Sequence, residues 1–339
     1  NIYRDVTASM YPAIAQNEQR LWYESQEENL AYYENQAAEE NEQAKQIIAE
    51  NEKAATEQPV QQESQNVDET PTQKESKKPE KKTETSGKKV SVNRKKLQDF
   101  DYLRQTFYQV DNTTTIGKNQ LDVDKLMKPD LRIDQSVDGP QILIYHTHSQ
   151  ERYADSKDEK TGVVGVGDYL TELLEEEGFQ VMHHKGEYDV GDRDHAYSKA
   201  APSIQKIIND NPSIQVVIDL HRDGVGENTR LVTTQNGKKM AKIMFFNGLS
   251  RTRVNGDLVG MANPYLQDNL AFSLQMKIAA ETKYPGFARR NYLRGYKYNM
   301  DLMPRMLLIE AGAQTNTVEE MRNAMEVLAD LLNSVLTGR

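Results

Sequence analysis

The chain has 339 residues, a formal net charge of −10 and no cysteine, which excludes disulfide scaffolds, cysteine nucleophiles and cysteine-based zinc sites. Its length allows one large domain or two smaller ones. Only 37% of the residues are apolar, so we expect part of the chain to remain unpacked. The net acidity argues against a general nucleic-acid-binding protein.

The first 96 residues are strongly polar. We expect residues 1–50 to form a helical segment, because Glu, Gln and Ala dominate 22–48 without Gly or Pro. Its patchy apolar side fits either contact with a partner or a solvated, fraying helix. Residues 51–96 contain no aromatic residue and are rich in Lys, Glu, Gln, Ser and Thr. Such a segment cannot bury enough apolar surface to offset its ordering entropy, so it is predicted to be a disordered linker.

Ordered structure is predicted from residue 97 onward. Residues 97–139 form a short helical lead-in, with an amphipathic helix over 97–110 and a small helix within 116–134. The remaining segment, 140–339, alternates short apolar runs with longer amphipathic stretches. The predicted strands and helices are 141–146, 163–178, 179–184, 196–212, 214–221, 264–286, 305–312 and 317–338. A hairpin is expected over 230–248, turning at Asn236-Gly237.

This alternation predicts an α/β fold. Strands separated by helices of about 15 residues favour a mostly parallel or mixed central sheet with helices on both faces. In such sheets, ligands bind beyond the carboxyl ends of the strands. Polar residues follow three of the predicted strands at that edge: His146, His148, Glu151, Asp219, His221 and Glu310.

The pair His148 and Glu151 indicates a metal site. A histidine followed three residues later by a glutamate just after a strand can turn both side chains toward one point, and imidazole plus carboxylate suits Zn²⁺. His221, at the end of another strand, can supply a third ligand, which leaves the fourth position open for water, as in catalytic zinc sites. Glu310 can then act as general base on the water and general acid on the leaving nitrogen.

Two residues of this set have alternative roles. His146 alternates with His148 along an extended chain, so only one of the two should face the site. His146 either orients a ligand from behind or is itself a ligand. Asp219 either holds His221 or serves the core. Each residue alone also has an ordinary structural explanation, and only their joint placement at three strand ends favours a metal centre.

Three stretches resemble a known family. These are ILIYHTHSQERY at 142–153, VVIDLHRDG at 216–224 and YNMDLMPRMLLIEAGAQTNTVEE at 298–320. They are similar to the stage II sporulation protein P family of endospore-forming bacteria, which is related to the zinc-dependent N-acetylmuramoyl-L-alanine amidases that cut peptidoglycan. The resemblance covers roughly 140–339 and implies a zinc amidase catalytic domain over that segment.

The resemblance also implies residue roles. It assigns zinc ligands to His148 and His221 and the catalytic glutamate to Glu310. The related amidases take a carboxylate ligand from the start of the first helix, here around 162–167, where no glutamate occurs. Glu151 is the nearest suitable acid, so whether His146 or Glu151 completes the site stays open. Three polar residues before the last strand either grip substrate or lie on the surface: Arg290, Arg294 and Asn299.

Family members look like amidases that also cut stem peptides and that work with the stage II sporulation proteins D and M during engulfment of the forespore. They resemble one another in being anchored outside the mother-cell membrane by an N-terminal helix. The start at Asn1 rather than Met fits removal of such an anchor, so an extracytoplasmic location is expected. Two other functions stay open: a zinc carboxypeptidase-like peptidase, and a non-catalytic scaffold that binds the cell wall.

Overall fold

The computed structural model describes residues 92–339. The helix expected over 22–48 and the linker expected over 51–91 lie outside the described residues. At the end of that linker the prediction is wrong, because α3 (Arg94–Leu97) is helical. The Asn93 side chain accepts hydrogen bonds from the backbone N–H groups of Lys95 and Lys96, which caps this short helix.

The lead-in contributes a strand to the central sheet. Helix α4 (Phe100–Phe107) is followed by strand β1 (Tyr108–Val110), and α5 (Val123–Leu126) comes next. The helix expected over 97–110 is therefore too long at its carboxyl end. Strand β1 pairs in parallel with β10 (Asn291–Arg294), and both lead-in helices pack their leucines against α8 (Leu266–Lys283).

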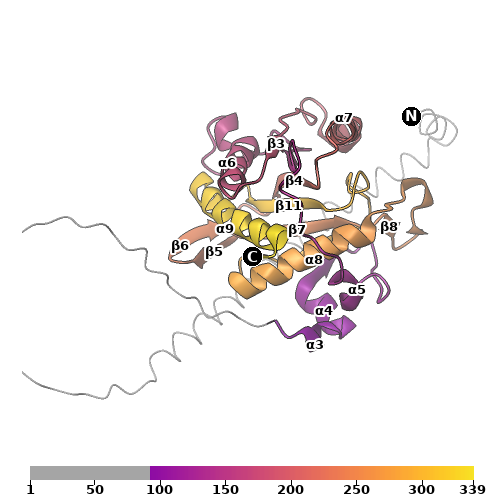
Figure 1. Cartoon of the computed structure of the whole chain (residues 1–339). Helices are drawn as coiled ribbons and strands as arrows, with labels where there is room; N and C mark the ends of the chain where they lie inside the picture. Colours follow the sequence, from indigo (N-terminus) through magenta and orange to yellow (C-terminus); the bar gives the residue numbers. More distant parts are fainter. Residues whose placement is uncertain (1–91) are drawn as a thin grey trace, which may run out of the picture.

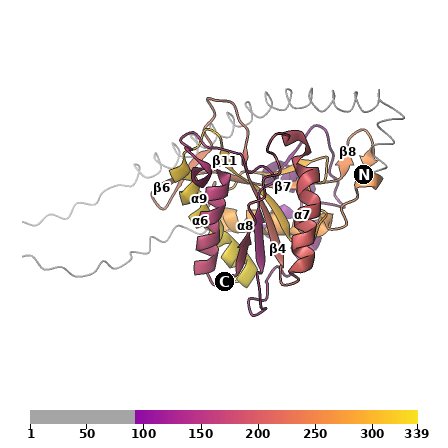
Figure 2. The same ribbon diagram turned by 90° about the horizontal axis from the view of Figure 1, so that it is seen from above.

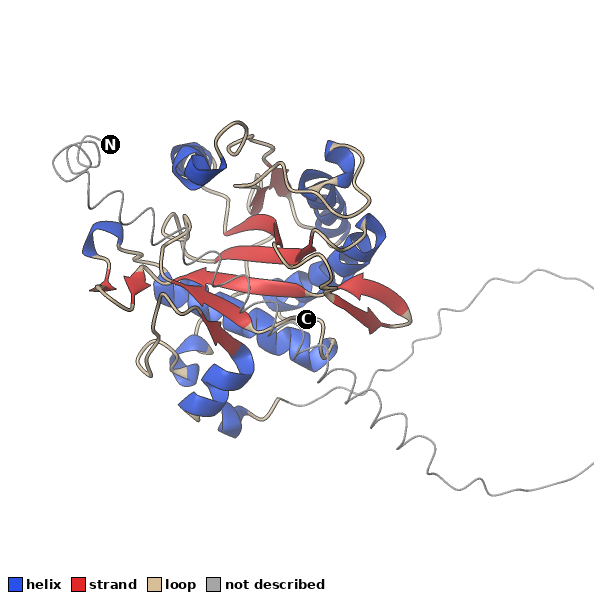
Figure 3. Cartoon of the chain, turned by 180° about the vertical axis from the view of Figure 1, so that it is seen from behind, coloured by secondary structure: helices blue, strands red, loops and turns tan. Residues whose placement is uncertain are grey.

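Seven strands form the central sheet in the order β1-β10-β7-β11-β4-β2-β3. Its other members are β2 (Ile142–Tyr145), β3 (Val181–His183), β4 (Val216–Asp223), β7 (Ile243–Gly248) and β11 (Met306–Ala313). Neighbouring strands are parallel except for β7 and β11. The predicted α/β fold with a mixed sheet is confirmed, and Figure 3 shows the strands enclosed by helices.

Helices cover both faces of the sheet (Figure 1). Helices α6 (Val163–Glu176), α8 and α9 (Val318–Thr337) pack with one face in the main apolar core. Helix α7 (Ala196–Asp210) packs on the opposite face against alternate residues of β2 and β4, and Figure 2 shows α6 and α7 beside β4 from above. Short 3₁₀ turns lie at Glu159–Thr161 (η1), Arg193–His195 (η2) and Val259–Met261 (η3). None of the helices within 92–339 has the length and apolar character needed to cross a bilayer.

The predicted hairpin is present but shorter than expected. Strands β5 (Val232–Gln235) and β6 (Lys238–Ala241) are joined by Asn236 and Gly237, both at positive φ, as a tight hairpin turn requires. The pair extends from one end of the molecule (Figure 3). The expected second arm breaks after Ala241, because the residues that follow form β7 of the central sheet. A smaller unpredicted hairpin joins β8 (Arg251–Thr252) and β9 (Gly256–Asp257).

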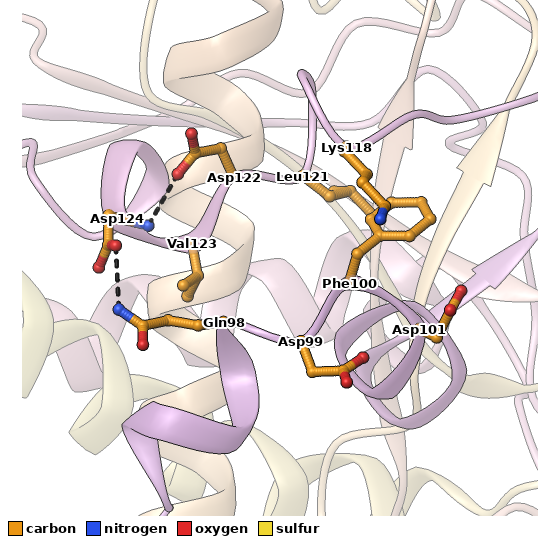
Figure 4. A pocket seen from close by; sticks show the side chains of 9 residues that line it. All are labelled: Gln98, Asp99, Phe100, Asp101, Lys118, Leu121, Asp122, Val123 and Asp124. Atoms are coloured by element: carbon orange, nitrogen blue, oxygen red, sulfur yellow. Dashed lines mark hydrogen bonds between the residues drawn. The ribbon is translucent and has the colours of Figure 1, made fainter.

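An acidic hollow lies on the lead-in, between the start of α4 and the residues before α5 (Figure 4). Its carboxylates already serve local structure. Asp99 caps α4, Asp122 caps α5, and Asp124 accepts a hydrogen bond from the Gln98 side chain. Asp99 and Asp122 are thus helix caps and Asp124 is the partner of Gln98, so we do not assign the hollow a function.

Gly312 shapes the chain just after Glu310. The pairing of β11 with β4 shifts register between Glu310 and Ala313, which is a β-bulge. Gly312 has φ +63°, and a Cβ atom there would lie 2.6 Å from the Met321 sulfur and 2.9 Å from the Ala241 Cβ. Only glycine fits this position without strain or displacement of its neighbours.

Replacing Gly312 with alanine should therefore lower the free energy of unfolding by about 1–3 kcal/mol, through backbone strain and steric overlap. Urea denaturation followed by circular dichroism measures the change. Gly260→Ala is the matched control, because a Cβ atom added to Gly260 would meet nothing within 4 Å and its φ is not left-handed. Equal stability losses in the two variants would contradict this assignment.

Candidate active site

Strands β4 and β11 bring His221 and Glu310 together. The two residues are direct cross-strand partners in the parallel pairing. Since side chains alternate along a strand, Asp219 and His221 project from the same face of the sheet, the face covered by α7. Glu310 projects from that face as well, because Leu307 and Ile309 beside it pack in the core of the other face. The sequence-based expectation that these strand ends meet is confirmed.

Asp219 connects the loop after β2 to β4. Its carboxylate accepts hydrogen bonds from the Thr147 backbone N–H (2.9 Å) and hydroxyl (2.7 Å). The same carboxylate lies 2.7 Å from His221 Nε2, an ion pair whose angle falls short of an aligned hydrogen bond. Burial opposes a charge on His221, but Asp219 outweighs it and raises the pKa of His221 to about 9. Asp219 thus holds both the loop and the imidazole.

Glu151 lies on the other side of the His221 ring. Its side chain is buried, and Oε2 is 3.8 Å from His221 Nδ1. Oε2 accepts a hydrogen bond from the Arg222 backbone N–H (2.8 Å), and Oε1 accepts one from the Arg193 guanidinium (2.7 Å). The carboxylate is therefore fixed in orientation and faces Nδ1 of His221.

His148 completes the group. Its ring lies edge-on to the His221 ring, with 5.3 Å between centroids. Burial and the nearby His221 lower the pKa of His148 to about 4, which keeps the imidazole neutral, the form that binds metals. Its Nδ1 atom is buried without a hydrogen bond and lies 3.8 Å from an Asp189 oxygen.

His146 points to the opposite face. Its Nδ1 donates to the Leu220 carbonyl (2.7 Å), and its Nε2 lies 2.8 Å from His183 Nε2. His183 in turn donates through Nδ1 to Asp168 (2.9 Å). Both nitrogens of His146 are thus engaged beneath the loop that carries His148. This placement fits the role of orienting the loop from behind better than the role of a ligand.

Glu310 is half-buried, and its Oε2 atom is buried without a hydrogen-bond partner. Burial and the neighbouring Asp223 carboxylate raise the pKa of Glu310, against the opposing effect of His221. Asp223 itself is paired with Arg289 at 2.6 Å. A carboxyl group of raised pKa beside the His221 imidazole is suited to proton transfer.

The three proposed substrate contacts have different surroundings. Arg290 donates to the Gln105 carbonyl (3.3 Å) on the lead-in. Asn299 donates to the Tyr197 carbonyl (2.8 Å) and is buried, so it positions the start of α7. Arg294 lies over the Tyr298 ring at 5.9 Å. Of the three, Arg294 alone donates no hydrogen bond to a backbone carbonyl within residues 92–339.

Sequence reasoning missed three residues of the site. Arg193 and Asp189 come from the loop between β3 and α7, and Tyr197 stacks on His221 with 6.3 Å between centroids and 11° between planes. Arg193 also lies 3.6 Å from Asp189. No motif distinguishes these residues from ordinary surface residues, because their role depends only on where the loop folds.

A model of the stage II sporulation protein P family matches residues 12–333. The chain belongs to this family. Stage II sporulation protein P of Bacillus subtilis strain 168 is 25% identical over 245 residues, which are 66% of this chain and 58% of that protein. The family assigned from the three sequence stretches is therefore confirmed.

Solved amidase structures are also similar. An N-acetylmuramoyl-L-alanine amidase from Clostridium difficile 630 matches with a TM-score of 0.35 and 13% identity, covering 59% of this chain and 95% of that one. The apo form of the amidase Ami1 from Mycobacterium abscessus matches with a TM-score of 0.32 and 11% identity, covering 58% and 97%.

The site residues of this family member can be tested against the requirements of Zn²⁺. Among residues 92–339, no three His, Asp or Glu side chains already converge as ligands of one ion. The donor types of His148, Glu151 and His221 nevertheless match those of zinc, and they are neighbours in space. In the described part of the chain, His148 Nδ1 and Glu310 Oε2 are buried and have no hydrogen-bond partner. The donor types present therefore suit zinc, while the described side chains are not arranged around one point.

Replacing Asp219 with asparagine should lower the free energy of unfolding by about 1–3 kcal/mol, because His221 loses its buried counter-charge. Guanidinium or urea denaturation of the chelator-treated protein measures this loss. Asp138→Asn, at an exposed position, should change stability by less than about 0.5 kcal/mol. Indistinguishable midpoints for the two variants would show that Asp219 does not hold the site.

Proposed function

We propose that this protein is a peptidoglycan hydrolase that cleaves the amide between N-acetylmuramic acid and L-alanine, with endopeptidase activity on stem peptides as a second activity. One observation carries the proposal. His148, Glu151 and His221 gather beside Glu310, whose buried oxygen has no partner within the described part of the chain. Paired imidazoles and carboxylates of this kind are the machinery of zinc-dependent amide hydrolysis.

His148, Glu151 and His221 are the proposed zinc ligands. Zinc, when bound, supplies an acidified water and polarises the carbonyl to be attacked. Asp219 keeps the His221 ring in place through its 2.7 Å contact with Nε2, which leaves Nδ1 on the side of Glu151. Carboxylates that orient a ligating histidine in this way are common in metal sites. Here Asp219 also anchors Thr147, next to His148.

Glu310 is the proposed proton-transfer group. It accepts a proton from the attacking water as the new C–O bond forms, and it donates a proton to the alanine nitrogen as the C–N bond breaks. The products are a carboxylate on the muramic acid and a stem peptide with a free amino terminus. Its raised pKa supports the donating half of this cycle.

The biological setting follows from family membership and is part of the proposal. We infer that the enzyme acts in forespore engulfment, outside the cytoplasm and attached to a membrane. Its proposed partners are the stage II sporulation proteins D and M. The chain spans 58% of the length of its Bacillus subtilis relative, so these properties of the whole protein are carried over only as proposals.

Glu310→Gln should reduce hydrolysis of purified peptidoglycan by at least about 100-fold, since the amide cannot take up and return the proton. Chromatography of the digest, with end-group labelling of new alanine amino termini, measures the reaction. Asp138→Asn serves as the control for a neutralised exposed carboxylate and should digest at the normal rate. Full activity of Glu310→Gln would refute the assigned role.

His148→Ala and His221→Ala should each lose bound zinc, whereas His146→Ala should retain it. Inductively coupled plasma mass spectrometry of the dialysed proteins gives the metal content directly. The expected difference follows from His146 facing the opposite side of the sheet and using both ring nitrogens there. Zinc retained by the first two variants, or lost only by His146→Ala, would overturn the ligand assignment.

The same digests separate the alternatives. Release of intact stem peptides with amino-terminal alanine supports the amidase. Cleavage only of free peptides from their carboxyl ends would support a carboxypeptidase-like enzyme instead. Binding to cell wall without any product, by a protein that contains zinc, would indicate a scaffold.

A further inference from the structure

Arg294 lies on the same face of the sheet as the proposed catalytic group. Glu310 pairs with Met244 of β7, and Gly248 of the same strand pairs with Arg294 of β10. Met244 and Gly248 are four residues apart, so both project from one face, and their partners do the same. The two residues are thus separated by one intervening strand and by four residues along that strand, about 13 Å.

The guanidinium of Arg294 forms no ion pair among residues 92–339. Its side chain lies over the Tyr298 ring, 5.9 Å from the guanidinium carbon to the ring centroid. The preceding arginines differ, since Arg289 pairs with Asp223 and Arg290 donates to a lead-in carbonyl. Arg294 is also half-buried. A half-buried guanidinium held against a ring, without an ion-paired carboxylate, is well suited to bind one from a ligand.

The negative charge of Asp111 favours the charged form of Arg294, although the two side chains form no ion pair among the described residues. Burial opposes the charge on Arg294, whereas Tyr298, Tyr292 and Asp111 favour it and raise the pKa of the guanidinium. The Asp111 carboxylate itself accepts hydrogen bonds from the Tyr292 hydroxyl and from the Thr113 backbone N–H (2.8 Å). Arg294 therefore stays fully charged, and its donors are left for a ligand.

Aromatic rings connect this arginine to the site. Tyr298 lies 5.2 Å from Tyr197, and Tyr197 stacks on His221 at 6.3 Å. With the 5.9 Å from Arg294 to Tyr298, the guanidinium carbon lies within about 17 Å of the His221 ring, the span of an extended peptide of about five residues. A peptide of about five residues with one end at the proposed zinc ligands is therefore long enough to reach Arg294.

We propose that Arg294 is a carboxylate-binding subsite, which holds a carboxylate of the stem peptide while the muramic acid–alanine amide lies at His221 and Glu310. The inference rests on the proposed function, because it takes the scissile amide to lie beside Glu310. The stem peptide offers two sources of this chemistry, its terminal carboxylate and the carboxylates of its side chains. Arg294 is in this view a specificity-determining residue, remote from the reacting atoms.

Binding can be measured without turnover in the Glu310→Gln protein. Isothermal titration calorimetry with a synthetic muramoyl pentapeptide gives the dissociation constant. Adding Arg294→Gln should weaken binding about tenfold or more, the usual effect of losing a charge-assisted hydrogen bond. Arg294→Lys should weaken it less, because the charge remains. Arg132→Gln is the control, since Arg132 is exposed and packs beside Gly338 at the end of α9, on the other side of the sheet.

Amidated ligands identify the carboxylate. A peptide with an amide at its terminus, and another with amides on its side chains, are compared with the free acid. The ligand that lacks the bound carboxylate should bind about tenfold more weakly than the free acid and should no longer respond to Arg294→Gln. Equal affinity of the Arg294→Gln and parent proteins for the free acid overturns the subsite.

The failure of the subsite and the failure of the proposed function have different signatures. If the protein with Glu310 intact cleaves muropeptides and Arg294→Gln binds the ligand as tightly as the parent, only the Arg294 subsite is refuted. If the zinc-containing protein does not cleave muropeptides, the proposed function is refuted. The calorimetric comparison of the Arg294 variants then still tests whether Arg294 binds a carboxylate.

Discussion

The site depends on the buried carboxylate of Asp219. A buried charge destabilises a fold unless it is paired and hydrogen-bonded. Asp219 meets this condition by contacting Thr147 twice and His221 once, so that the loop after β2 is tied to the end of β4. That loop carries His148 and Glu151. His221, one of the groups that the proposed chemistry needs, is therefore also one of the groups that satisfy the buried charge.

The two faces of the sheet carry different kinds of residues. One face packs against α6, α8 and α9 in a continuous apolar core, which fixes the strands. The other face carries His221 and Glu310 near α7, and its aromatic residues continue across β7 and β10 toward Arg294. The register with β7 puts Arg294 on this face, and the reversal of chain direction between β11 and β7 puts it about four residues along the sheet from Glu310. The proposed reaction site and the proposed carboxylate subsite thus lie on the same face of the sheet.

The local pattern of the sequence predicted much of the fold. The runs at β2, β4 and β11 are apolar and bounded, and the Thr317–Glu320 capping box marks the start of α9 as expected. Strands β1 and β10 were missed because they are short, and β10 begins with a buried Asn291 whose polarity is untypical of a strand. Strand β7 was merged with β6, because a one-residue break at Lys242 leaves no signal in the pattern.

By itself, the sequence determined which residue types follow each buried strand, and hence the candidate set of histidines and carboxylates. It also contained the three stretches that identify the family. The tertiary structure decided that His146 turns to the face of α6 while Glu151 approaches His221. It also decided that Arg193, Tyr197 and Arg294 join the surroundings of the site. The reason is physical: alternation along a strand is local, whereas contacts between distant segments depend on strand order, direction and register, which no single segment specifies.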